Sequence, residues 1–479
     1  MNEAPLPTQS VLTRSLPPPP PFVDQTRGPS RLRTSLAACS AEGLAAEVVG
    51  ACFGNAVVTA WGVAVGASPL LLGVLWGLPH FGQVFQLPAS WVTSRFGRKR
   101  VAVVMHSLAR QITLPIAVLP FVDASIDVKR AVLVTLFALS SLLSVIGHNA
   151  WLAWMGDLVP ARVRGAYFGR RTAMCTAVAT VASLAIAFAL DAGRVHSVLG
   201  KVLAATIVGR SLAGAVTTVL MLQQHDPSGR NVTPALRDLT LPITDRAYRK
   251  LLAYRGAWGI ATGLTASLSA VFTLRALGLG FFGVAMYAAV VAVLRVFTTP
   301  LWGRALDRAG ARPVLVACTL GAALSTLAWV GATAGSAWLI AIDALVCGLL
   351  LGGQELAVFT LPLASAPSER RPVFAAASVM VGGVAYGLSS VAGGALAGSM
   401  SVRTLLVLSS ACRLLATVLA TRLEEPRARR PRSDPPALLR DLRDSRSERL
   451  AFLSPSPPPT CSPSSTSSPS SPQTHSRAT

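Results

Sequence analysis

The sequence predicts an all-α membrane protein in which twelve transmembrane helices form two six-helix repeats. Three observations support this prediction: the composition is strongly apolar, apolar stretches of membrane-spanning length recur along the chain, and one short motif occurs twice, about half the chain apart. Of the 479 residues, 52% are hydrophobic and only 13% are charged, which is more apolar than a soluble domain needs for its core. We therefore expect most of the chain to lie in lipid.

Apolar stretches of about 20 residues, the length that crosses the hydrocarbon core of a bilayer, recur through the middle of the chain. Long apolar runs without two-residue alternation favour helices over the strands of a barrel. In the first half we expect helices at 42–65, 69–93, 101–122, 131–156, 171–191 and 200–221. In the second half we expect them at 253–275, 280–303, 313–333, 337–362, 372–398 and 402–423.

The polar segments define the domain boundaries. Residues 1–40 are rich in proline and arginine, and residues 424–479 are first arginine-rich and then rich in serine and proline. Neither segment can bury a core, so we expect two disordered cytoplasmic tails. Between them we expect a six-helix bundle at 41–222, a central cytoplasmic loop at 223–251 and a second six-helix bundle at 252–423.

The net charge of +22 lies mainly in turns and tails. If the N-terminus is cytoplasmic, most of the basic residues in short turns also lie on the cytoplasmic side, and this bias predicts that both termini are cytoplasmic. Nucleic-acid binding is the other explanation of the charge, but this distribution leads us to expect no nucleic-acid partner. Arginine outnumbers lysine and alanine is abundant, which favours a bacterial protein and hence the cell inner membrane.

The repeated motif lies in a turn between two expected helices in each half. The second copy reads Gly303-Arg304-Ala305-Leu306-Asp307-Arg308-Ala309-Gly310-Ala311-Arg312-Pro313, and the first reads Ser90-Trp91-Val92-Thr93-Ser94-Arg95-Phe96-Gly97-Arg98-Lys99-Arg100. Arg95 and Arg308, Gly97 and Gly310, and Lys99 and Arg312 all pair at one offset of 213 residues. A second correspondence, at an offset of 206, pairs His148-Asn149 with Gln354-Glu355. The two halves are therefore expected to be copies of one six-helix unit.

Through these turns the chain resembles the major facilitator superfamily over roughly residues 41–423. The resemblance implies the major facilitator fold, in which helices one, four, seven and ten line a central cavity. It also implies that the two motif turns hold helices together on the cytoplasmic side in the outward-facing state. We therefore predict a conformational latch at Arg95, Gly97, Arg98, Asp157, Arg164, Gly303, Asp307, Arg308, Gly310 and Arg312.

Each residue type in this latch has an expected physical role. The glycines let helices approach closely, and the aspartate caps a helix start and pairs with a nearby arginine. The first copy has Ser94 in place of the aspartate, so its latch should be weaker, with Asp157 supplying the carboxylate to Arg98 or Arg95. The alternative is that these charges only follow the positive-inside bias.

Polar residues inside the expected helices are candidates for the substrate and proton pathway, because an ionisable group in lipid is costly unless it is paired or hydrated. The candidates are Glu355, Gln354, Arg295, His148, Asn149, Asn55 and Gln83. Glu355 is the first choice as a proton-binding carboxylate, with Arg295 as its partner or as a ligand for an anionic substrate. The alternatives are a purely structural Glu355–Arg295 ion pair and a His148 that only packs.

Four further charged residues are expected to have structural roles. Glu42 and Glu47 lie near the start of the first expected helix, where we expect them to cap its N-terminus. Arg210 and Arg413 occupy similar places in the sixth and twelfth helices and are expected to bond to neighbouring helices.

The sequence contains no phosphate-binding loop, nucleophile elbow or clustered metal ligands, so we expect no enzyme activity, cofactor or metal. The energy source is then a gradient. We expect a monomeric secondary active transporter that works by alternating access on a small molecule, with proton-coupled export of an amphipathic compound as the leading hypothesis. The alternatives are an uptake carrier, an uncoupled facilitator or sensor of the same fold and, more distantly, a membrane-embedded enzyme.

Overall fold

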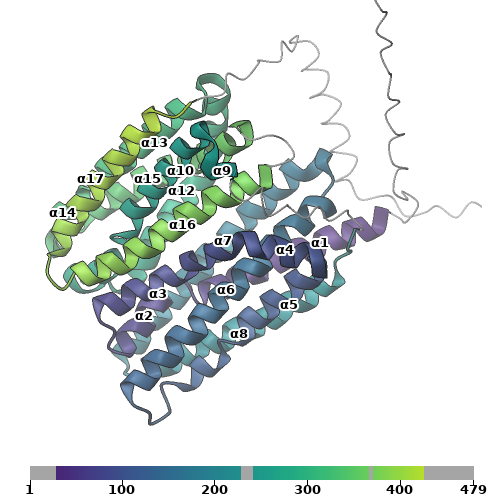
Figure 1. Ribbon diagram of the computed structural model, residues 1–479. Coiled ribbons are helices and arrows are strands. Elements are labelled where there is room, and N and C mark those ends of the chain that lie inside the picture. Colours follow the sequence, from purple (N-terminus) through teal and green to yellow (C-terminus); the bar gives the residue numbers. More distant parts are fainter. Residues whose placement is uncertain (1–28, 228–240, 366–370, 425–479) are drawn as a thin grey trace, which may run out of the picture. The chain divides into compact units, whose positions relative to one another are not determined.

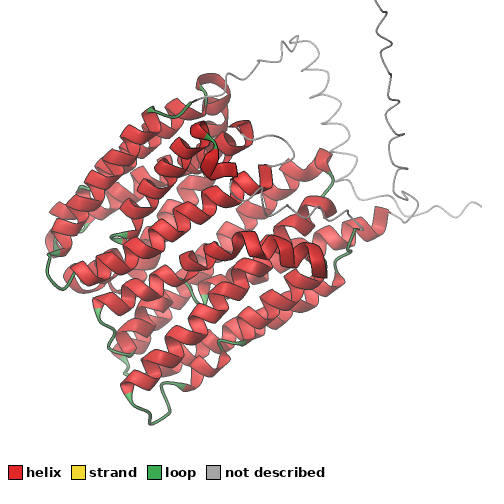
Figure 2. Cartoon of the chain, viewed as in Figure 1, coloured by secondary structure: helices red, strands yellow, loops and turns green. Residues whose placement is uncertain are grey.

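Helices and short turns make up the whole described part of the chain (Figures 1 and 2). The computed structural model describes residues 29–227, 241–365 and 371–424, and no strand occurs in these ranges. All of them fall within one compact unit. The expected tails before residue 29 and after residue 424, part of the central loop, and Arg370 lie outside the described residues.

The helices of the two halves follow in chain order. The first half contains α1 (Pro29–Ala51), α2 (Asn55–Ala64), α3 (Pro69–Phe81), α4 (Gln86–Phe96), α5 (Arg98–Gln111), α6 (Ile126–Leu158), α7 (Ala161–Val195) and α8 (Leu199–Gln223). The second half contains α9 (Leu241–Thr244), α10 (Arg246–Gly263), α11 (Ala266–Val271), α12 (Gly280–Ala309), α13 (Ala311–Ser325), α14 (Ala328–Gly331), α15 (Trp338–Ser365), α16 (Arg371–Leu396) and α17 (Val402–Thr421). Short 3-10 turns lie at Gly82–Phe85, Leu114–Val118 and Ala334–Ser336, and a π-helical turn spans Phe272–Ala276.

Eleven helical spans within the described residues are long and apolar enough to cross a membrane. The expected helix at 69–93 is the exception, because it is divided into α3, a 3-10 turn and α4. Pro79 lies inside α3 and removes a backbone donor from its hydrogen-bond ladder, which favours this interruption. The prediction of an all-α membrane protein is confirmed, with a shorter apolar helix at Pro69–Phe85 completing the twelve.

The first helix starts at Pro29, earlier than the sequence indicated, so residues 29–40 are not part of a disordered tail. Packing explains the difference. Leu36 and Cys39 are buried, and the hydroxyl of Tyr167 on α7 donates a hydrogen bond to the Leu36 carbonyl at 3.0 Å. Contacts with other helices therefore extend α1 through a segment whose sequence alone is too polar to indicate a span.

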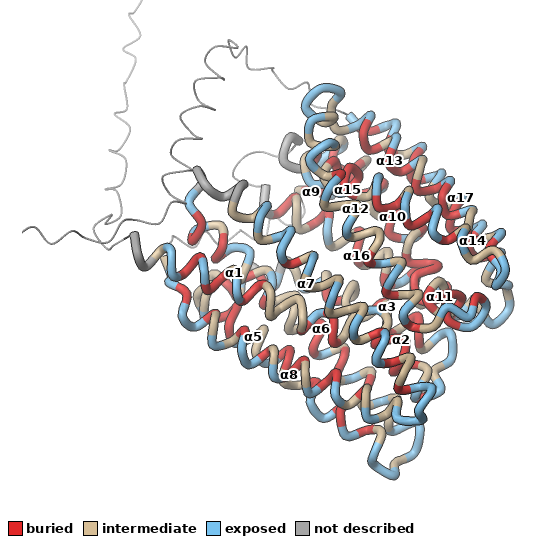
Figure 3. The backbone as a smooth tube through the Cα atoms, turned by 180° about the vertical axis from the view of Figure 1, so that it is seen from behind, coloured by how far each residue is buried: buried red, intermediate tan, exposed pale blue. Residues whose placement is uncertain are grey.

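Large apolar side chains cover the outward faces of the helices, as lipid requires. On α7, Val181 and Phe188 are 68% and 67% exposed, and Phe297 on α12 is 72% exposed. Figure 3 shows buried positions gathered between helices and exposed ones on their outer faces. A soluble protein rarely leaves so many large apolar groups in water, so these faces are contact surfaces for acyl chains.

The two halves repeat one interhelical contact. The guanidinium of Arg210 on α8 lies 5.0 Å from the ring centroid of Phe53, and that of Arg413 on α17 lies 5.7 Å from the ring of Trp258. Each arginine also donates to a backbone carbonyl of a neighbouring helix, Arg210 to Val49 at 3.0 Å and Arg413 to Ala322 at 3.2 Å. Both arginines therefore do bond to neighbouring helices, as the sequence suggested.

The helices run between two ends of the bundle. The proximal end is the one at which α1 begins and α8 and α17 end, and the distal end is the opposite one. At the distal end the halves meet along α3 and α16, where the hydroxyl of Ser390 donates to the Gly73 carbonyl at 3.0 Å. Also near this end, the carboxylate of Asp191 on α7 accepts hydrogen bonds from the Phe281 and Phe282 amides at 2.9 and 2.8 Å. A side chain of the first half thus caps the first turn of α12 in the second.

Candidate functional site

Two of the apolar spans are broken at corresponding positions of the two halves. In the first half α1 ends at Ala51 and α2 begins at Asn55, and in the second α10 ends at Gly263 and α11 begins at Ala266. Backbone groups at such breaks leave the regular ladder and need other partners. Matching interruptions in the two copies of a membrane repeat are the best pointer to a binding site that a sequence or fold offers.

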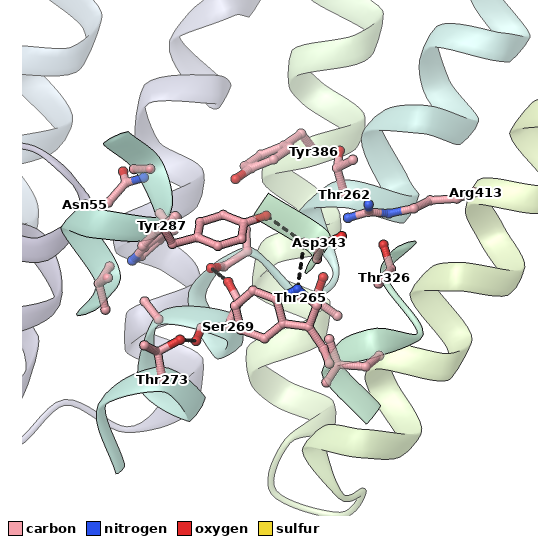
Figure 4. A pocket seen from close by; sticks show the side chains of 17 residues that line it. Asn55, Thr262, Thr265, Ser269, Thr273, Tyr287, Thr326, Asp343, Tyr386 and Arg413 are labelled. Atoms are coloured by element: carbon pink, nitrogen blue, oxygen red, sulfur yellow. Dashed lines mark hydrogen bonds between the residues drawn. The ribbon is translucent and has the colours of Figure 1, made fainter. Parts of the chain in front are cut away.

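A pocket of about 260 Å³ lies beside both breaks. Figure 4 shows hydroxyl groups and aromatic rings of the second half around it, together with the Asn55 amide of the first half. Its walls are formed by Asn55, Trp76, Thr262, Thr265, Ala266, Ser269, Ala270, Thr273, Val284, Tyr287, Ala288, Thr326, Trp329, Asp343, Tyr386, Leu406 and Arg413. The lining therefore offers many hydrogen-bonding groups and four aromatic side chains, together with one carboxylate and one guanidinium.

Asp343 on α15 is the acidic group of this pocket and is only 3% exposed. Its Oδ2 atom accepts hydrogen bonds from the Tyr287 hydroxyl and the Trp329 indole N–H, each at 2.7 Å (Figure 4). The Cys347 thiol lies 3.4 Å from Oδ1. A buried carboxylate at membrane depth is costly without such donors, and it is a functional-site candidate by default.

Arg413 on α17 brings a positive charge to the same pocket. No ion pair joins it to Asp343 within 4.0 Å in the described ranges, and its Nε atom is buried without a hydrogen-bond partner there. The side chain instead donates to the Ala322 carbonyl and lies against Trp258. The pocket thus contains two opposite charges that do not neutralise each other directly.

Asn55 is the member of the sequence-based candidate set that lines this pocket, as the first residue of α2. Asp343 was missed, although it lies within the expected helix at 337–362 and meets the criterion that selected Glu355. The hydroxyl and aromatic wall was also missed, because threonine and tyrosine within an apolar helix do not stand out without their neighbours.

Glu355 and Arg295 lie outside the pocket and form an ion pair at 2.8 Å. Their side chains are 58% and 40% exposed, so this pair is not a buried one. The adjacent Gln354 is buried, and its Nε2 atom donates to the hydroxyl of Tyr254 at 3.1 Å.

The corresponding residues of the first half make a related contact. Asn149, which corresponds to Glu355 at the offset of 206, donates from its side-chain amide on α6 to the Gln86 carbonyl on α4 at 2.8 Å. Gln83 accepts a hydrogen bond from the Gln86 amide at 2.6 Å. His148 is stacked on Trp151 with ring centroids 5.8 Å apart. These residues do not line the pocket.

The glycines of the repeated motif act through backbone conformation. Gly97 and Gly310 have φ values of +89° and +93°, and each ends one helix and begins the next. A Cβ atom at Gly97 would meet nothing within 4 Å, and one at Gly303 would meet only Leu356 at 3.8 Å. The expectation that Gly97 and Gly303 allow close helix approach is therefore wrong. Gly97 and Gly310 are needed because L-residues rarely adopt positive φ.

The basic residues two positions after these glycines cap helix C-termini. Lys99 donates to the Leu222 and Gln224 carbonyls at the end of α8, at 2.9 and 2.5 Å. Arg312 donates in the same way to the Thr421 carbonyl at the end of α17. A cation at this end of a helix satisfies open carbonyls and opposes the helix dipole. Each motif turn thus connects the third and sixth spans of its own half.

The acidic residues of the expected latch differ in their contacts. Asp157 forms an ion pair with Arg98, as the sequence suggested. Asp307 lies in the last turn of α12, so the expectation that it caps a helix start is wrong, and no described residue forms an ion pair with it. Arg308 is exposed, and the Arg95 guanidinium lies 5.9 Å from the ring centroid of Trp91. The side chain of Arg164 lies outside the described residues.

Glu42 does not cap its helix, because α1 begins at Pro29 and places Glu42 in the helix interior. The side chain is buried and lies 3.3 Å from Arg171 and 3.9 Å from Arg110. This cluster joins α1, α5 and α7 within the first half. Glu42 is therefore a buried ion-pair residue.

The broken helices, the polar pocket between two related halves and the apolar outer faces define a multi-pass membrane protein with a transporter fold. A family model described as Major Facilitator Superfamily matches residues 256–458. The match covers less than half of the chain and, together with the fold, supports a major facilitator superfamily transporter. This agrees with the resemblance seen in the sequence, and no curated protein sequence gives a significant match.

Solved structures of distant sequence share the fold. A crystal structure of a D-xylose-proton symporter has a TM-score of 0.65 and 15% identity, covering 83% of this chain and 99% of its own. The xylose transporter XylE from E. coli, in a partially occluded inward-open conformation, has a TM-score of 0.60 and 13% identity, covering 84% and 99%. A mutant of the nucleoside transporter NupG has a TM-score of 0.65 and 10% identity, covering 81% and 100%. At these identities the likeness concerns the fold alone.

Proposed function

We propose that this chain is a secondary active transporter that moves a small molecule through the pocket beside the two helix breaks by alternating access. The main support for this proposal is the position of Asp343. It is a buried carboxylate in the wall of a membrane pocket, and two of its hydrogen-bond donors, Tyr287 and Trp329, line the same wall. No structural requirement of a helix bundle explains such a group, because an apolar residue there would pack without the cost of desolvation.

We propose a proton as the coupling ion and Asp343 as its first binding group. Protonation would remove a buried charge, and it would loosen the hydrogen bonds that Tyr287 and Trp329 donate. A substrate that contacts these donors would then bind the two protonation states differently, which is the condition for coupling. The Glu355–Arg295 pair is the second candidate, since its partial exposure gives a proton access.

We propose a small amphipathic substrate. The rings of Trp76, Trp329, Tyr287 and Tyr386 offer apolar faces, while the threonine and serine hydroxyls of α10 and α11 offer hydrogen bonds. The volume of about 260 Å³ limits the ligand to a compact molecule in this state. Arg413 would contact an anionic group of the ligand if it has one.

We propose the cell inner membrane as the location, with both termini in the cytoplasm and the monomer as the working unit. In that orientation the proximal end is cytoplasmic, and the contacts between α3 and α16 at the distal end correspond to an inward-facing state. We propose export as the direction of transport. Uptake by symport is the alternative, because the D-xylose-proton symporter has the same fold.

A ligand screen tests the site. Wild-type protein in detergent would be heated with amphipathic compounds, sugars, nucleosides and organic acids, and a ligand that binds the folded state raises its melting temperature. Tyr287→Phe and Trp329→Phe should lose the shift caused by a positive compound, whereas Glu355→Gln should keep it, because Glu355 does not line the pocket. Equal shifts in all three variants would place the binding site elsewhere.

A further inference from the structure

A second pocket, of about 450 Å³, lies at the proximal end of the first half. It is lined by Thr34, Ser35, Lys99, Gln223, Gln224, His225 and Asp226, none of which lines the pocket around Asp343. These residues come from the first turns of α1, the start of α5 and the end of α8. The pocket therefore lies at the ends of these apolar helices, where the chain becomes polar.

Gln224 is the residue of this pocket whose side chain indicates a bound ligand. It is 1% exposed, and neither its Oε1 nor its Nε2 atom has a hydrogen-bond partner among the described residues. Native proteins pair nearly all buried polar groups, because an unpaired amide loses its bonds to water without replacement. An apolar side chain would be more stable at this position unless something binds the amide.

The charges around Gln224 are of both signs and are held apart. The ammonium of Lys99 is fixed by the Leu222 and Gln224 carbonyls, which leaves one of its three protons for another acceptor. The carboxylate of Asp226 is exposed and has no ion pair within the described segments. The Ser35 hydroxyl is oriented by accepting a hydrogen bond from the His225 amide at 3.1 Å.

We propose that this pocket binds a zwitterion that carries an ammonium group and an oxyanion. The ammonium would donate to Gln224 Oε1 and to Asp226, while the oxyanion would accept from Gln224 Nε2 and Lys99. One ligand then pairs with both the oxygen and the nitrogen of the Gln224 amide. A simple anion or a simple cation would pair with only one of them. A phospholipid headgroup with a primary amine and a free aminophosphate share this chemistry.

The test uses the full-length protein and two probes. In detergent, O-phosphoethanolamine is titrated and the melting temperature is followed. In nanodiscs, phosphatidylethanolamine is compared with phosphatidylcholine of the same acyl chains, because the quaternary ammonium of choline has no hydrogen to donate. We expect a higher melting temperature with at least one of the two ethanolamine probes. A response in detergent indicates a site open to free zwitterions, and a response confined to nanodiscs indicates a lipid site.

Two leucine variants connect the response to the amide. Gln224→Leu should melt at or above the wild-type temperature without ligand, because it removes an unsatisfied group, and its affinity for the ethanolamine probe should fall about tenfold or more. Gln111→Leu is the matched control, because the Gln111 amide donates to the Ser211 carbonyl at 3.1 Å. It should melt lower than wild type yet keep the response. An unchanged response in Gln224→Leu, or no response of the wild type to either probe, would overturn the proposal.

Discussion

Replacing Gly73 with alanine should push the two halves apart at the distal end. A Cβ atom at Gly73 on α3 would lie 2.3 Å from the carbonyl oxygen of Ser390 on α16, which is far inside van der Waals contact. Because the obstacle is backbone, it cannot rotate away as a flexible side chain would. The two helices must separate by about 1 Å to reach ordinary contact, and the hydrogen bond from the Ser390 hydroxyl to the Gly73 carbonyl would be lost or lengthened.

Overpacking of this kind costs about 1–3 kcal/mol. Since a factor of ten corresponds to about 1.4 kcal/mol, the population of the distally closed arrangement should fall about 5- to 140-fold relative to an open one. The change can be followed by pulsed electron spin resonance between labels on Ala67→Cys and Ser399→Cys, in the turns before α3 and before α17. The distance between the two labels should be longer in Gly73→Ala than in the protein with glycine at this position, because the distal ends of the two halves move apart.

Gly50→Ala is the control for this experiment, because a Cβ atom there meets nothing within 4 Å. It should leave the label distance unchanged. If Gly73→Ala folds normally and gives the wild-type distance distribution, the close contact does not hold the distal end closed, and our interpretation of the interface is refuted.

Two further predictions concern stability. Gly310→Ala should lower the free energy of unfolding by about 1–3 kcal/mol, because alanine does not tolerate φ of +93° and ψ of 167°. Gly303→Ala should be neutral or slightly stabilising, because its Cβ atom would make only an ordinary contact with Leu356; thermal unfolding in detergent compares the two variants. Glu42→Gln should cost about 3–5 kcal/mol, because it leaves partly buried Arg171 and buried Arg110 without their carboxylate. Asp127→Asn at an exposed ion pair should cost under about 1 kcal/mol. Equal losses in either matched pair would contradict the assigned roles.

The number and order of the helices and their duplication could be predicted from the sequence. Each helix that crosses a bilayer needs about 20 mainly apolar residues, and such a pattern is visible even when a few residues within it are polar. The motif turns could also be aligned by eye, and the structure adds a shared role for Lys99 and Arg312 as C-terminal caps. That role depends on where α8 and α17 end in space, which spacing along the chain does not reveal. The early start of α1 was missed for the same reason, since Cys39 is stabilised by distant helices.

The candidate site was predicted only in part. Asn55 lines the pocket, but Glu355 and Arg295 pair outside it, and Asp343 replaces them as the buried ionisable group. The sequence indicates how far along its helix a residue lies. It does not indicate whether the side chain faces the pocket or another part of the protein. The matching breaks of α1–α2 and α10–α11 also leave little trace in the sequence, since glycine occurs throughout these helices.

Proton coupling in reconstituted vesicles tests the central claim most directly. With a ligand identified by the thermal screen, an imposed pH gradient should drive accumulation by the wild type. Asp343→Asn should lose gradient-driven accumulation while still exchanging substrate down its own gradient, because asparagine keeps the shape of the site and cannot titrate. Accumulation by Asp343→Asn at the wild-type level and with the wild-type pH dependence would contradict the account, and loss of coupling in Glu355→Gln alone would assign the proton to the Arg295 pair.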